Sequence, residues 1–77
     1  MERQREVNFT KRESEVLMYM CKGYQAGEIA ELLKISKRTV ETLKSNMFNK
    51  TNIHKEIKLV LFALDKKLFK EVEYVYN

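Results

Sequence analysis

The middle of this 77-residue chain carries short polar and basic side chains at the spacing of one helical face: Arg38, Thr42, Ser45 and Asn49. At 100° per residue these positions share one side of a helix, and Glu41 and Asn46 flank them. Such side chains can hydrogen-bond to the edges of bases, and the major groove of duplex DNA admits one α-helix. The chemistry that this face suggests is base contact rather than catalysis.

Positive charge is concentrated around the same face. Residues 34–58 hold seven basic and two acidic side chains, whereas residues 1–33 hold five basic and six acidic ones. Lys37, Arg38, Lys44 and Lys50 lie within about four helical turns. This distribution is typical of a surface that binds a polyanion, although a solvated lysine face would give the same pattern.

The composition argues against catalysis, metal binding and membrane insertion. Cys21 is the single cysteine and His54 the single histidine, so we interpret them as a core residue and a loop residue. The sequence has no glycine-rich phosphate loop and no apolar run near the ~20 residues that span a bilayer. We expect no enzyme activity, no cofactor, no metal site and no membrane contact, in a reducing cytoplasm.

The elements that position the polar face are predicted to be helices, because the chain has no proline and only two glycines. Thr10 and Glu13 form a capping-box pattern that starts a helix at Lys11, and Gly23 ends it in the left-handed conformation. A second helix runs from Gln25 or Ala26 to Leu33. The expected core residues of these two helices are Val16, Leu17, Met20, Cys21, Ile29, Ala30 and Leu33.

The third helix, over about 37–51, begins after Ser36 as N-cap and ends at Asn52. Its apolar arc is Val40, Leu43, Met47 and Thr51, with the stem of Lys44 at the edge. A fourth helix starts near Lys55. Its 3.6-residue stripe is Ile57, Val60, Leu61, Leu64 and Leu68, which Leu59 and Phe62 widen. A helix that is apolar on so many sides needs a second partner.

Three helices with a short turn between the second and third have the arrangement of a helix-turn-helix. The sequence also resembles the C-terminal domain of LuxR-type regulators, the NarL/FixJ or GerE type, over about Phe9 to Phe69. The matching residues are Phe9 to Glu13, Glu15 to Leu17, Lys22, Gly23, Glu28 to Ala30, Leu33, Ile35, Ser36, Thr39, Val40, Ser45 to Met47, Lys50 and Ile53.

The resemblance implies a four-helix domain over residues 1–77, with core 9–69 and tail 70–77, that binds promoter DNA as a sequence-specific transcriptional regulator. It also implies a homodimer through the last helix, which we assign to Ile57, Val60, Leu61 and Leu64 and expect to be weak in isolation. Carried over by position, Lys37, Thr39 and Lys50 hold phosphates, and Gln25 and Ala26 touch the DNA backbone. Arg38, Glu41, Thr42 and Ser45 face the bases, and Lys44 and Asn46 complete the expected DNA-binding set.

Glu41 departs from the pattern, because the family usually has lysine or another non-acidic residue there. Its carboxylate could accept a hydrogen bond from a cytosine amino group, or pair with Arg38 or Lys44. The same residue favours an alternative function, a protein-interaction module that docks an acidic partner or RNA polymerase. Three smaller departures also occur. Lys11 replaces a frequent proline of the family, Thr51 and Asn52 replace a common Leu-Gly pair, and Lys55 replaces a common serine cap of the last helix.

Overall fold

The computed structural model describes residues 8–66, which contain four helices and no strand. They are α1 (Lys11–Cys21), α2 (Ala26–Leu33), α3 (Lys37–Thr51) and α4 (Glu56–Lys66). The predicted all-α class is confirmed, and α4 begins one residue after the expected Lys55. The expected continuation of the α4 stripe to Leu68 and the tail 70–77 lie outside the described residues.

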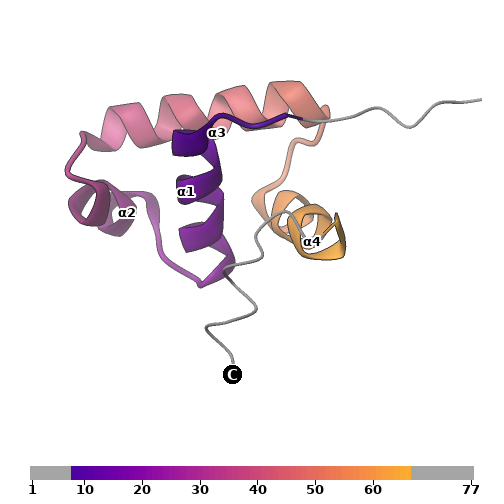
Figure 1. Cartoon of the computed structure of the whole chain (residues 1–77), viewed down its shortest axis with the longest axis horizontal. Helices are drawn as coiled ribbons and strands as arrows, with labels where there is room; N and C mark the ends of the chain where they lie inside the picture. The colour runs from indigo at the N-terminus through magenta and orange to yellow at the C-terminus, as the bar shows by residue number, and fades with distance from the viewer. Residues whose placement is uncertain (1–7, 67–77) are drawn as a thin grey trace, which may run out of the picture.

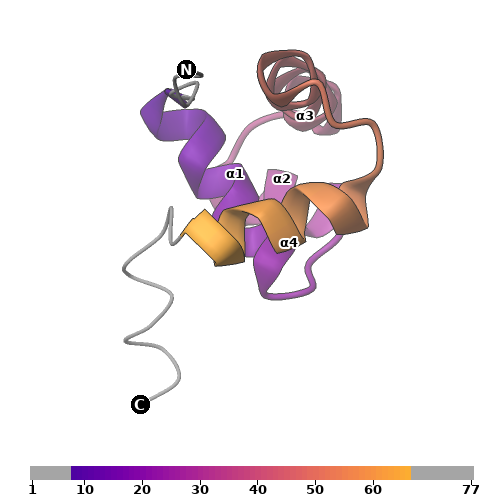
Figure 2. The same ribbon diagram turned by 90° about the vertical axis from the view of Figure 1, so that its right-hand side faces the viewer.

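Helix α1 is the central element, because it packs against each of the other three. In Figure 1 α3 runs across the top of the molecule, and α2, α1 and α4 all lie beneath it. The view turned by 90° agrees, since α3 again lies at the outside and α4 crosses near α1 (Figure 2). One long side of α3 is therefore held by the rest of the domain, and the opposite side is left open.

Local capping interactions fix where α1 and α3 begin. The Thr10 hydroxyl accepts from the Glu13 amide at 3.1 Å, and the Glu13 carboxylate accepts from the Thr10 amide at 2.9 Å. The Ser36 hydroxyl accepts from the Thr39 amide at 3.0 Å. Both predicted N-caps are thus confirmed. Gly23 follows α1 with φ 94°, and Asn52 ends α3 with φ 62°, which confirms the two predicted left-handed stops.

The turn between α2 and α3 depends on a left-handed residue that the sequence did not predict. Lys34 has φ 57° and ψ 47°, and its amide donates to the carbonyls at the end of α2. The next amide, of Ile35, donates to the Ala30 carbonyl at 3.0 Å. These bonds satisfy carbonyls that the helix end would leave free, and they let the chain change direction between α2 and α3 within three residues.

The core joins all four helices and consists of Val16, Leu17, Met20, Ile29, Ala30, Val40, Met47, Leu59 and Ala63. The expectation that Leu59 merely widens the α4 stripe is wrong, since Leu59 and Ala63 are the fully buried positions of that helix. Ile57, Leu61 and Leu64 are exposed instead. Periodicity could not choose between the two faces, and the small Ala63 side chain lets α4 lie close to α1.

We predict that Lys34→Gly stabilises the domain, because an L-residue in the left-handed region is strained and glycine is not. The free energy of unfolding should rise by about 0.5–1 kcal/mol. Lys58→Gly is the matched control, since it removes the same charge from an exposed position inside α4 and should cost about 1 kcal/mol. Urea unfolding of both variants measures the free energy of unfolding. If Lys34→Gly loses as much stability as Lys58→Gly does, the backbone at Lys34 is not strained.

Candidate nucleic-acid interface

The polar face predicted for the third helix lies on the open side of α3. Val40 and Met47 are fully buried on the inner side. The side chains predicted to contact bases, together with their neighbours on that face, are all exposed: Arg38, Glu41, Thr42, Ser45, Asn46 and Asn49. The structure thus brings the predicted base-contacting residues together on one surface, where their side chains can reach a ligand without any rearrangement of the core.

The start of α3 combines two features that favour an anion. Lys37 and Thr39 are exposed in its first turn, and the Thr39 hydroxyl lies 2.9 Å from the Ser36 hydroxyl. The amide groups and the positive dipole end of a helix also attract anions at this position. The start of α2 is similar but carries an acid, because the Gln25 amide donates to the Glu28 carboxylate at 2.8 Å. Gln25 is exposed there and Ala26 is partly buried.

Lys44 lies away from this surface. Its ammonium pairs with Glu56 of α4, and its side chain is only 13% exposed. The side chain is largely buried at the edge of the apolar arc, and its charge is directed to Glu56 of α4 rather than outward. Of the two neighbours proposed to pair with Glu41, Lys44 is therefore committed elsewhere, and the ion pairs found within residues 8–66 include none between Glu41 and Arg38.

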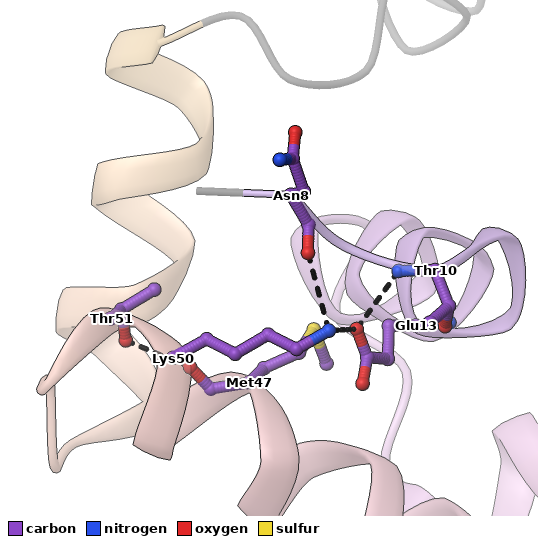
Figure 3. Close-up of polar contacts among 6 residues, drawn as sticks. All are labelled: Asn8, Thr10, Glu13, Met47, Lys50 and Thr51. Atoms are coloured by element: carbon purple, nitrogen blue, oxygen red, sulfur yellow. Dashed lines mark hydrogen bonds and ion pairs between the residues drawn. The ribbon is translucent and has the colours of Figure 1, made fainter. Parts of the chain in front are cut away.

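Lys50, expected to hold a phosphate, is also engaged within the domain. Figure 3 shows its ammonium between the Glu13 carboxylate, at 2.7 Å, and the Asn8 carbonyl oxygen, at 3.2 Å. Glu13 is buried, whereas the Lys50 side chain is 36% exposed. The capping pattern predicted one partner of Glu13, but no local signal in the sequence connects it to a lysine 37 positions later.

Three comparisons with known proteins bear on this geometry. Residues 7–63 match the family model described as "Bacterial regulatory proteins, luxR family". The chain belongs to the luxR family. This confirms the resemblance seen in the sequence, and it agrees with a helix-turn-helix formed by α2 and α3.

The luxR-family relatives include the oxygen regulatory protein NreC of Staphylococcus carnosus, 46% identical over 59 residues, and NreC of Staphylococcus epidermidis, 44% identical. The match covers 77% of this chain but only 27% of either NreC. A solved structure described as a complex of Vibrio cholera VqmA with a ligand and DNA matches with a TM-score of 0.74 and 30% identity. That match covers 86% of this chain and 29% of the VqmA chain.

A shallow groove of this luxR-family domain lies apart from the open face of α3. It is lined by residues of the α1–α2 junction, by the Lys44–Glu56 pair and by the start of α4. Cys21 lies in it, partly buried against the core, and burial raises the pKa of its thiol to about 11. No group of three or more potential metal ligands occurs in the described part of the chain, where no helix is long and apolar enough to cross a membrane. His54 is exposed in the loop after α3, as predicted.

We predict that Cys21 of the folded domain reacts slowly with iodoacetamide at pH 8, because only the thiolate attacks. A pKa of about 11 instead of 9.0 lowers the thiolate fraction by about two orders of magnitude, and the rate should fall accordingly. The same protein in urea provides the control, since unfolding restores an ordinary thiol. Equal alkylation rates in the two conditions would contradict the structural interpretation of Cys21.

Proposed function

We propose that this domain binds duplex DNA in a sequence-specific manner, with α3 in the major groove, as the DNA-contacting part of a transcriptional regulator. The observation that carries the proposal is the division of α3 into a buried apolar side and an exposed polar and basic side. An α-helix with its side chains is about 10–12 Å across, so it fits the major groove, which is about 12 Å wide. Membership of the luxR family and the DNA complex described for VqmA support the same function.

Phosphate contacts would come from the start of each helix in the pair. Lys37 and Thr39 lie in the first turn of α3, where the helix dipole adds to the lysine charge. Gln25 and Ala26 lie at the start of α2. Such contacts supply affinity without sequence preference, because every duplex carries the same phosphates. Sequence preference would then come from Arg38, Thr42 and Ser45.

A second copy of the domain is proposed to cover the outer face of α4. Ile57, Leu61 and Leu64 are 62%, 57% and 45% exposed, which is unusual for three large apolar side chains on one helix. Val60 is partly buried and forms the edge of this face. A two-fold contact through α4 would bury all of them, and two α3 helices could then occupy half-sites about one helical turn apart.

Protein docking is the alternative that one observation favours. Glu41 is exposed on the polar face of α3, where a carboxylate repels phosphate. An acidic protein or RNA polymerase docked on Lys37 and Arg38 could place a hydrogen-bond donor or a cation beside Glu41, which a phosphate backbone cannot. The two functions differ in specificity, since a DNA reader prefers its own site over a scrambled duplex by a large factor.

The first prediction compares Arg38→Ala with Lys37→Ala on a specific and a scrambled duplex. Arg38→Ala should weaken specific binding by roughly 10- to 100-fold and reduce discrimination, as expected for a bidentate guanine contact. Lys37→Ala should weaken both duplexes similarly and lower the salt slope by about 1. Fluorescence anisotropy at several salt concentrations measures both quantities. Equal losses of Arg38→Ala on the two duplexes would reduce Arg38 to a phosphate ligand.

The second prediction concerns α4. Leu61→Lys should abolish cooperative binding to a duplex with two half-sites and leave helical circular dichroism unchanged, because it places a charge in the proposed two-fold contact. Leu32→Lys is the matched control, since Leu32 is a similarly exposed leucine on α2. Such a small contact is weak without DNA, so cooperativity is the appropriate measurement. Cooperativity that survives Leu61→Lys would exclude this face.

The third prediction uses a substitution at Glu41 to decide between DNA reading and protein docking. Glu41→Gln should tighten binding to unrelated DNA and shrink the ratio between specific and scrambled duplexes, since the acid excludes sites that leave it unpaired. Glu31→Gln, at another exposed acid, should leave the ratio unchanged. If the parent shows no specificity and Glu41→Gln creates DNA binding, the protein-docking alternative is favoured.

A further inference from the structure

Glu13 is the one buried charged side chain among residues 8–66, with 2% of its surface exposed. One of its oxygens, Oε1, accepts from the Thr10 amide at 2.9 Å and from the Lys50 ammonium at 2.7 Å. The same ammonium donates to the Asn8 carbonyl at 3.2 Å (Figure 3). The bonds join the chain that enters α1 to the last turn of α3.

These contacts engage the Lys50 ammonium within the domain. A buried carboxylate that loses its cationic partner is left with an uncompensated charge, so the pair is costly to break. The Phe9 ring lies 6.0 Å from the Lys50 ammonium and covers the same region. A phosphate that engaged Lys50 would compete with Glu13, Asn8 and Phe9 at once. By contrast, Lys37, in the first turn of α3, takes part in none of the ion pairs found within residues 8–66.

We propose that Lys50 and Glu13 are positioning residues for DNA binding, an inference that rests on the function proposed above. The pair holds the far end of α3 against the start of α1 and so sets the direction in which the polar face is presented. It contributes to specific affinity through this alignment and neutralises no phosphate.

The geometry of α3 explains why its far end needs a second attachment. The near end is fixed by the short turn from Lys34 to Ser36 and by buried Val40. Towards the far end buried Met47 is the core contact, and the Lys50 bonds add a second one in the last turn. A tilt of about 5° around that end moves the other end of a helix of this length by about 2 Å. Hydrogen bonds to base edges weaken over a few tenths of an ångström, so Ser45 and Asn49 would lose their contacts first.

Substitutions that change the charge of the pair distinguish a positioning role of Lys50 from a phosphate contact. Glu13→Gln removes a negative charge, so simple electrostatics predicts tighter DNA binding. The positioning role predicts weaker specific binding from the same substitution, because the Lys50 ammonium loses its anchor. Lys50→Met separates the two roles in a second way, since only a phosphate contact changes the salt slope.

The experiment measures binding of the parent, Glu13→Gln, Lys50→Met and the double variant to a duplex selected from random sequence and to a scrambled duplex. Several salt concentrations are used, at a temperature where circular dichroism shows each protein folded. Each single substitution should weaken specific binding by about 3- to 30-fold, and the double should be no weaker than the weaker single. The salt slope should change by less than about 0.3, whereas Lys37→Met, the matched control, should lower it by about 0.9.

The proposal is overturned if Lys50→Met lowers the salt slope as much as Lys37→Met does, or if Glu13→Gln tightens specific binding. Should Glu13→Gln unfold at the working temperature, the salt slope of Lys50→Met compared with that of Lys37→Met decides the matter alone. Thermal unfolding of the same four proteins without DNA gives an independent measure of the coupling free energy between Glu13 and Lys50. A parent that binds no duplex refutes the proposed function, while a parent that binds normally with unchanged variants refutes only the positioning role.

Discussion

Helix α3 packs against the other helices through one side only, and the rest of the domain depends on this constraint. Val40 and Met47 are buried among residues of the other helices, and in both views of the fold those helices lie on one side of α3. A small domain has little apolar surface to bury, so these contacts must hold α3 without covering its other side. The free side can then carry polar residues at no cost to the core.

Charge serves two purposes in this chain, and the sequence does not separate them. Of the four basic residues clustered between positions 37 and 50, two are used inside the domain: Lys44 pairs with Glu56 of α4, and Lys50 pairs with buried Glu13. The first pair connects α3 to α4, and the second connects α3 to the first turn of α1. The cluster therefore stabilises the placement of α3 as well as providing positive charge for a polyanion, and Lys37 and Arg38 remain exposed for the second purpose.

The helices could be predicted because their signals are local. The Thr10–Glu13 box, the Ser36 cap and the left-handed Asn52 each involve residues within one turn, and all occur where the sequence placed them. The face of α4 that packs on α1 could not be predicted, since Leu59 and Leu61 are equally apolar and only the three-dimensional contact distinguishes them. The Glu13–Lys50 and Lys44–Glu56 pairs join distant positions and leave no trace in the local pattern. The exposed face of α3 was predicted, and its contact with DNA stays a prediction.

The central claim is that the open side of α3 lies in the major groove, and nuclear magnetic resonance tests it most directly. The ¹⁵N-labelled domain would be titrated with a duplex selected from random sequence while backbone amide shifts are recorded. We expect the largest shifts along the exposed side of α3, from residue 37 to residue 49, and in the first turn of α2. Shifts confined to α1 and α4, with the α3 amides unmoved, would contradict the account.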